Sequence, residues 1–150
     1  MKLENNQVKQ SRSEIMKKVK STSRMEELVR KSLWERGIRF RKNVKDLFGK
    51  PDIAIKKYKI VIFIDSCFWH ACPKHGRMPK SNVDYWINKL ERNKTRDLEV
   101  NQFYLNQKWN LKRVWEHELK EDFMGTINSL ERFIKELEDN YGNVLNNKPH

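Results

Sequence analysis

The spacing of apolar residues predicts a helix near the start of the chain and two more in its second half. Between Ser23 and Gly37 an apolar residue recurs every three or four positions among charged ones, as on an amphipathic helix. The same period predicts a long helix from Val83 to about Lys108 and a final helix after His117. A shorter basic helix is predicted from Ser11 to Lys20.

Strands are predicted between these helices, where the apolar period shortens to two. Apolar and polar residues alternate from Ile38 to Val44 and from Asp52 to Lys56, as on half-buried strands. The run IVIFI from Ile60 to Ile64 is apolar throughout and predicts a central strand, and a last strand follows from Leu111 to Trp115. This order of elements predicts an α/β fold, with a mixed sheet flanked by helices.

The chain length of 150 residues predicts one domain, which we place at residues 11–140 between flexible polar tails, 1–10 and 141–150. No apolar run approaches the roughly 20 residues needed to cross a bilayer. The first ten residues also lack the apolar centre of a secretory signal. We therefore expect a cytoplasmic protein without a membrane partner.

The charge balance favours an anionic partner. The chain carries 32 basic and 20 acidic residues, a formal net charge of +12. Nucleic acid is the leading partner for an excess of this size. The alternative is a basic surface without a ligand, as on many small secreted or ribosomal proteins. Individual residues must decide between the two.

Two aspartates, Asp52 and Asp65, stand at neighbouring ends of two predicted strands. The short connection between these strands should bring the carboxylates together, and such hard oxygen ligands suit Mg²⁺. Glu26 can approach from the first helix, and His70 is a candidate base for activating water. The alternative is that Asp52 caps a turn and Asp65 merely ends a strand.

Both cysteines lie in the segment CFWHACPKH, where Cys67, Cys72 and His75 have the spacing C-x4-C-x2-H. With His117 from far along the chain they predict a tetrahedral zinc site, because a polar loop containing proline has little else to fold around. His70 is a competing fourth ligand. The alternative is a pair of buried cysteines beside surface histidines.

Two aromatic residues lie within this segment, and two more begin the helix after it. Phe68 and Trp69 are adjacent and flanked by polar residues and proline. We therefore expect that they do not share one apolar pocket and that at least one stacks with DNA bases. The alternative is a core position, which is usual for aromatics at a helix start such as Tyr85 and Trp86.

Several segments together resemble the very-short-patch-repair (Vsr) endonucleases, bacterial enzymes that nick DNA at T:G mismatches left by deamination of 5-methylcytosine. The resemblance extends from about Ser11 to Glu118, most of the chain, with its segments in one order. These segments are SRSEIMKKVKSTSRME, GIRFRKN, GKPDIAI, VIFIDSCFWHACPKHGRMPKSNVDYW, KLERNKTRD and WNLKRVWEHE.

The resemblance implies a restriction-endonuclease-like fold with a structural zinc site, and Mg²⁺-dependent hydrolysis of one strand 5′ to the mismatched thymine. It assigns Mg²⁺ to Asp52 and the main-chain carbonyl of Ile64. It makes His70 the base, with Glu26 holding metal-bound water. The other implied roles are zinc ligation by Cys67, Cys72, His75 and His117, and a DNA wedge of Phe68, Trp69 and Trp86.

Two departures from the family pattern bear on this site. Ile64, Asp65 and Ser66 stand where the family has threonine, histidine and glycine, which makes Asp65 an additional candidate ligand of Mg²⁺. The acidic-x-lysine pair of many restriction-like nucleases is absent, and its loss favours a histidine-based mechanism.

The expected partner is double-stranded DNA with a T:G mismatch, bound by a nucleoid-associated bacterial monomer, with other mismatch-repair proteins as further partners. The first alternative is a restriction-like or mobile-element endonuclease with another target, separated from this reading only by base-edge contacts. The second is a zinc-dependent DNA-binding module without catalysis, which would not need Asp52, Glu26 and His70 together.

Overall fold

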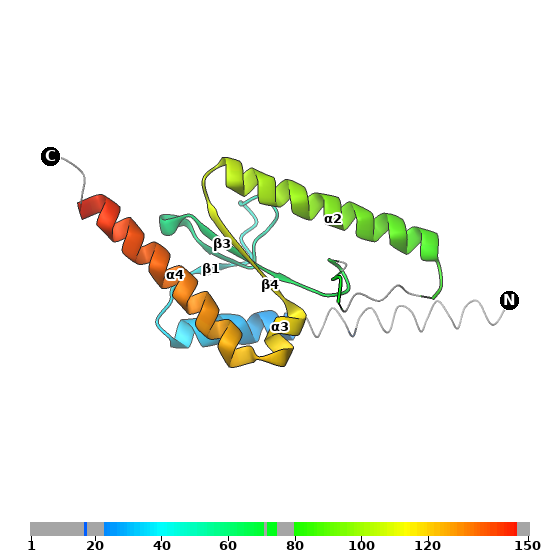
Figure 1. Cartoon of the computed structure of the whole chain (residues 1–150), viewed down its shortest axis with the longest axis horizontal. Coiled ribbons are helices and arrows are strands. Elements are labelled where there is room, and N and C mark those ends of the chain that lie inside the picture. The colour runs from blue at the N-terminus through cyan, green and yellow to red at the C-terminus, as the bar shows by residue number, and fades with distance from the viewer. Residues whose placement is uncertain (1–16, 18–22, 71, 75–79, 147–150) are drawn as a thin grey trace.

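The computed structural model describes residues 17, 23–70, 72–74 and 80–146, and it confirms the predicted α/β class. Within these residues one mixed sheet forms the middle layer (Figure 1). Its strands are β1 (Arg41–Lys42), β2 (Ile53–Ile55), β3 (Ile60–Asp65) and β4 (Asn110–Trp115). They lie in the order β1-β2-β3-β4, with β3 and β4 parallel and the other neighbours antiparallel.

Helices cover both faces of this sheet (Figure 1). The long helix α2 (Val83–Asn106) connects β3 to β4 and packs on one face. The helix of residues 23–35 and α4 (Phe123–Asn146) pack on the other, and the short helix α3 (Glu116–Glu121) joins β4 to α4. The predicted mixed sheet flanked by helices is therefore confirmed.

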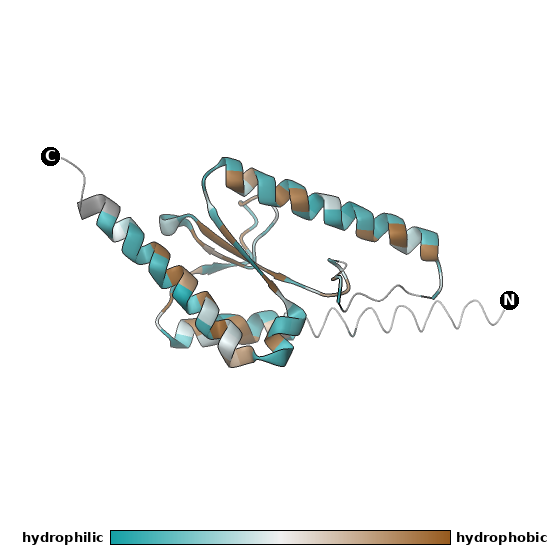
Figure 2. Ribbon diagram, in the orientation of Figure 1, coloured by the Kyte–Doolittle hydropathy of each residue, from teal (hydrophilic) through white to brown (hydrophobic). Residues whose placement is uncertain are grey.

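The alternation of side chains along β3 supplies both cores. Ile60, Ile62 and Ile64 pack with the helix of residues 23–35 and α4, whereas Val61 and Phe63 pack under α2. All six positions of β3 are buried, and the first five are apolar, as expected for a strand that is covered on both faces. Figure 2 shows this apolar character in the middle of the sheet. The same alternation directs Asp65, the last residue of β3, to the α2 face.

Three element boundaries differ from prediction. β1 is confined to two residues instead of extending to Val44, because Asn43 adopts a positive φ of 49° that breaks the strand. The final helix is divided at Asp122, and α3 already contains His117. α4 continues to Asn146, past the predicted start of the tail at 141, where the Tyr141 ring packs 5.2 Å from that of Tyr58.

Two predictions on the early chain cannot be compared with the structure. The tail of residues 1–10 and the short helix from Ser11 to Lys20 fall outside the described residues, apart from position 17, which is helical. Among the described helices, none has the length and apolar character that a membrane span requires.

Candidate active site and metal centre

A cavity of about 290 Å³ opens where β3 ends, and residues from five parts of the fold line it. Asp65 comes from the end of β3, Asp97 from α2, and Glu26 from the helix of residues 23–35. Asp52 precedes β2, and His70 follows β3. We call these five residues the carboxylate centre. The structure thus brings together Glu26, Asp52, Asp65 and His70, as the sequence predicts.

The position of Asp52 is fixed by the edge of the sheet. Its Oδ2 atom accepts a 2.7 Å hydrogen bond from the Ile64 N–H, so the carboxylate lies against the end of β3. The guanidinium of Arg30 is 4.0 Å from its Oδ1 atom. Burial raises the pKa of Asp52, and the Ile64 hydrogen bond opposes this shift. The stabilisation that Arg30 and the Ile64 N–H give to the charged form of Asp52 is therefore smaller than the cost of burying that charge.

Glu26 is the second carboxylate in the cavity. Burial, followed by the neighbouring charge of Asp52, raises the pKa of Glu26 to about 7. Arg30, one turn later on the same helix, lies 3.5 Å from Glu26 and compensates part of this charge. Glu26 and Asp52 therefore compete for ionisation, and a bound cation would relieve both.

His70 is held by a partner that the sequence analysis did not assign to the site. Its Nδ1 atom lies 2.5 Å from Oδ2 of Asp97, so a neutral imidazole that donates from Nδ1 keeps Nε2 as its basic nitrogen. Burial lowers the pKa of His70, but the Asp97 hydrogen bond and the Asp65 charge oppose it, and the net shift is upward. This arrangement of imidazole and carboxylate is suited to accept a proton from water.

Asp65 is buried in an ion pair. Its oxygens lie 2.9 and 3.2 Å from Nη1 of Arg113 on β4, and its Oδ1 atom is 3.7 Å from Nδ1 of His70. Burial raises the pKa of Asp65, against the opposing charges of His70 and Arg113. Arg113 therefore contacts both oxygens of the carboxylate that the sequence suggests as an extra Mg²⁺ ligand.

Sequence reasoning missed Asp97, Arg113 and Arg30. Asp97 lies in the segment KLERNKTRD, but its charged neighbours make it resemble one position of a solvated helix face. Arg113 lies in a predicted strand, yet its meeting with Asp65 depends on the parallel register of β3 and β4. A basic residue within a half-buried strand was the available signal for Arg113.

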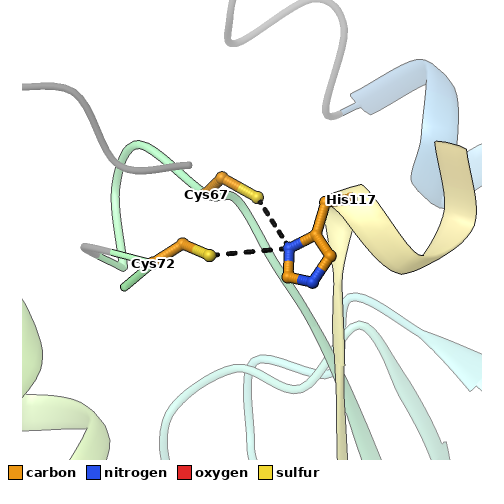
Figure 3. A group of neighbouring side chains, drawn as sticks. All are labelled: Cys67, Cys72 and His117. Carbon is orange, nitrogen blue, oxygen red and sulfur yellow. Dashed lines mark hydrogen bonds between the residues drawn. The ribbon is translucent and has the colours of Figure 1, made fainter. Parts of the chain in front are cut away.

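A second cluster forms two residues beyond Asp65. The Sγ atoms of Cys67 and Cys72 lie 3.4 and 3.5 Å from Nδ1 of His117, which α3 brings from far along the chain (Figure 3). We call these three residues the cysteine centre. The predicted fourth ligand, His75, lies outside the described residues. His70, the competing ligand, faces Asp97 instead.

The geometry of the cysteine centre fits a metal ion. The three ligand atoms lie within 4.8 Å of one another. Tetrahedral zinc would place sulfur and nitrogen ligands about 3.5 Å apart, as follows from its usual bond lengths. Burial raises the pKa of the Cys67 thiol to about 11, so a cation is needed to hold this residue as the thiolate. Cysteine and histidine are the donors that zinc prefers.

The aromatic residues pack together, contrary to the expectation for Phe68 and Trp69. Their ring centroids are 5.0 Å apart, and the Trp86 ring lies 5.4 Å from Phe68 and 5.9 Å from Trp69. Phe68 and Trp86 are buried, whereas Trp69 is partly exposed and lies below the Lys89 ammonium. The expectation of separate pockets was wrong, because α2 brings Trp86 against both rings.

The fold and the cavity define a class: a basic α/β protein with a histidine and several buried carboxylates in one cavity, as in phosphodiester hydrolases. The family model of the DNA mismatch endonuclease Vsr matches residues 5–75. The chain belongs to the Vsr family and is a DNA endonuclease, a hydrolase.

Curated relatives agree with this assignment. The type II nicking enzyme V.NmeAIP of Neisseria meningitidis is 42% identical over 131 residues, covering 85% of this chain and 92% of that enzyme. The type II nicking enzyme V.NaeI of Lentzea aerocolonigenes is 42% identical over 113 residues, 72% and 68% of the two chains. The DNA mismatch endonuclease Vsr of Escherichia coli is 31% identical over 85 residues, 56% and 54% of the two chains.

Proposed function

We propose that this endonuclease nicks one strand of duplex DNA 5′ to the mismatched thymine of a T:G pair, as a step of very short patch repair. The observation that carries the proposal is the His70–Asp97 pair opening into the same cavity as Asp52 and Glu26. Relatives named nicking enzymes support cleavage of a single strand, and the relative named a mismatch endonuclease supports a mispaired target.

In this proposal His70 is the general base. The hydrogen bond from Nδ1 to Asp97 orients the ring, and Nε2 takes the proton from the attacking water. Glu26 holds that water in line with the scissile phosphate. Lys50 and Arg96 line the same cavity and supply positive charge for the DNA backbone.

Mg²⁺ is assigned to Asp52 and the main-chain carbonyl of Ile64. A strand residue directs its N–H and C=O toward the same neighbour, and the Ile64 N–H is bonded to Asp52. The raised pKa values of Asp52 and Glu26 support this assignment, because a bound cation would stabilise the charged form of both carboxylates. When bound, Mg²⁺ would polarise the phosphate and stabilise the charge that develops on it.

Zinc is assigned to the cysteine centre, with His75 as its fourth ligand. Its role here is structural, because four protein ligands leave no open position for water. Zinc would fix the segment between Cys67 and Cys72, which carries Phe68, Trp69 and His70. The metal would in this way support both the catalytic histidine and the aromatic cluster.

Mismatch sensing is assigned to the aromatic cluster of Phe68, Trp69 and Trp86. Insertion of aromatic side chains beside a base pair costs unstacking energy, and this cost is lower where the pair is already weakened. Trp69 is the part-exposed member of the cluster and the first to meet the duplex. A monomer suffices for a nick, and other mismatch-repair proteins would act on the product.

The test is a strand-specific cleavage assay with Mg²⁺. Duplexes of one sequence, with either a T:G or a matched T:A pair, carry a different label on each strand. We expect one nick, 5′ to the mismatched thymine, and no cut in the opposite strand. Equal cutting of the matched duplex, or cleavage of both strands, would instead indicate a restriction-like nuclease with another target.

A further inference from the structure

Arg113 on β4 contacts both the end of β3 and helix α2 at the carboxylate centre. Its Nη1 atom donates to both oxygens of Asp65 at 2.9 and 3.2 Å, and its Nε atom donates to Oδ1 of Asn101 at 2.7 Å. Its Nη2 atom lies 3.4 Å from the main-chain oxygen of Asp97. The guanidinium also lies over the Phe63 ring, 4.6 Å from its centroid. One side chain on β4 therefore joins the end of β3 to two positions of α2.

These contacts bear on which carboxylate reaches His70. Asp97 lies 2.5 Å from Nδ1 of His70, and Asp65 lies 3.7 Å from the same atom. Nδ1 of a neutral imidazole has one proton to donate, so the two carboxylates are competing acceptors. Arg113 pairs closely with Asp65, at 2.9 and 3.2 Å, and only at 3.8 Å with Oδ1 of Asp97, so it weakens Asp65 more as an acceptor and leaves Asp97 as the stronger one. The Arg113 bond to the Asp97 carbonyl also holds that turn of α2 in place.

We propose that Arg113 is a positioning residue of the active site, which holds Asp65 away from His70 and holds Asp97 against it. This inference rests on the proposed role of His70 as the base. The Arg113 side chain is 17% exposed, and it lines the cavity while its guanidinium is bonded to Asp65, Asn101 and the Asp97 carbonyl. Its effect on hydrolysis is therefore exerted through His70.

A charge alone would not perform this task. The planar guanidinium donates in several directions at once, whereas a lysine ammonium is a point charge without that fork. Arg113→Lys keeps the charge beside Asp65 but cannot also reach Asn101 and the Asp97 carbonyl in the same geometry. Small displacements of a catalytic group are costly, and a shift of about 1 Å costs about a hundredfold in rate.

The experiment compares Arg113→Met, Arg113→Lys and the double variant Arg113→Met/Asp65→Asn by single-turnover nicking at saturating protein. Lys112→Met is the control, since Lys112 is next in the strand and lies over Phe133 on the other face. We expect Arg113→Met to lose about tenfold to a hundredfold in rate, with duplex affinity changed less than about twofold. Arg113→Lys loses about tenfold, and the control stays near wild type.

The double variant separates positioning from mere stability. Asp65→Asn keeps an amide oxygen but loses the negative charge, which makes it a much weaker acceptor for His70, so the double variant should nick about tenfold faster than Arg113→Met. A nitrogen-15 spectrum of the histidine rings gives a second readout, in which Arg113→Met changes the Nδ1 signal of His70 and the double variant restores it. If Arg113→Met does not fold, Arg113→Lys provides the same comparison of rate, affinity and spectrum.

Folded Arg113 variants with the wild-type rate and an unchanged His70 signal would overturn the inference, as would a double variant no faster than Arg113→Met. A failure of the proposed function is distinguishable, because wild-type protein would then cut matched duplex equally, cleave both strands, or cut no duplex. In that case the His70 spectrum still decides whether Arg113 positions the imidazole.

Discussion

The carboxylate centre and the cysteine centre meet in one short segment, where Asp65 and Cys67 are two residues apart, but they are built in different ways. Regular structure places the carboxylates of the carboxylate centre, since strand ends, α2 and the helix of residues 23–35 each supply one, while His70 comes from the turn after β3. The cysteine centre gathers two thiols from the segment after β3 and one imidazole from α3. Buried apolar packing fixes the first, whereas ligand atoms themselves must fix much of the second.

Because of this difference, substitutions in the two centres should have different effects. A change in the carboxylate centre leaves β2, β3 and their two cores intact, so chemistry should fail while the fold persists. A change in the cysteine centre removes the connection between the end of β3 and α3, so folding should fail first. Variants of the two centres should therefore differ in which property they lose.

The largest expected effect follows from Cys72→Ser. Losing a thiolate ligand should release zinc and lower stability by several kcal/mol, which lowers the melting temperature by about 10 °C in a chain of this size. Thermal unfolding and elemental analysis of zinc measure both effects. Lys74→Ser, an exposed change in the same segment, is the control. Zinc-free wild type that is equally stable would show that packing alone holds this centre.

The next effect is loss of cleavage in Asp52→Asn. The amide keeps the shape of the side chain but loses the charge that would hold Mg²⁺. We expect no nicking, with mismatch binding and melting temperature near those of wild type. Asp46→Asn, on the same loop but exposed and paired with Lys56, should cleave normally. A marked drop in stability of Asp52→Asn would mean that the carboxylate centre also holds the fold.

The sequence predicted the individual strands and turns of the two centres better than the contacts between distant elements. The apolar pattern was sufficient to predict β3, because in a sheet covered on both faces a continuous apolar run is typical of a buried central strand. The clustering of Asp52 with Asp65 followed from the short connection between two strands. Local patterns of this kind predict which residues lie in the same strand or turn.

What the sequence could not predict depends on long-range register. The contact between Arg113 and Asp65 requires β4 to lie parallel to β3, and no local pattern specifies that pairing. The Asp97 bond to His70 likewise requires α2 to pack across the sheet with the Asp97 side of the helix facing His70. The packing of Phe68 with Trp86 was missed for the same reason, because α2 supplies the apolar neighbour.

The third effect is a loss of rate in His70→Ala, about a hundredfold, the range for removal of a positioned general base. Zinc content and stability should remain close to wild type, because His70 belongs to the carboxylate centre. Single-turnover nicking and elemental analysis, carried out on the same preparation, measure both. Loss of zinc from His70→Ala would move this residue to the cysteine centre and make it a ligand.

The fourth effect is a pH dependence of stability that Glu26 produces. Its pKa is 4.5 in the unfolded reference and about 7 in the folded protein, so the folded state binds the proton more tightly. Without Mg²⁺, this contribution is fully present below pH 4.5 and is lost as the pH rises through about 7. Added Mg²⁺ should therefore raise the melting temperature more at pH 8 than at pH 5.

Glu26→Gln is the variant that tests this assignment. The glutamine has no proton to lose, so the dependence of the Mg²⁺ effect on pH should become shallower. Glu27→Gln, its exposed neighbour, is the control and should follow wild type. Equal pH profiles for wild type and Glu26→Gln would place the titrating group elsewhere in the carboxylate centre.

The smallest effect concerns Trp69, which lies on the segment between the two centres. Phosphate contacts carry little sequence information, so discrimination requires a group that tests base pairing. Unstacking one step costs a few kcal/mol, and each base stacked on an aromatic ring repays about 1–3 kcal/mol. A weakened T:G pair lowers the cost, so Trp69→Ala should reduce mismatch preference more than binding to matched duplex.

Both affinities must be measured at one salt concentration, because the electrostatic part of binding changes with salt. Trp34→Ala is the matched control, since Trp34 is 49% exposed and packs with Phe40, outside the aromatic cluster. We expect the ratio of T:G to matched affinity to fall about tenfold in Trp69→Ala, which corresponds to about 1.4 kcal/mol of stacking. An unchanged ratio with lowered stability would assign Trp69, like buried Phe68 and Trp86, to structural packing around the cysteine centre.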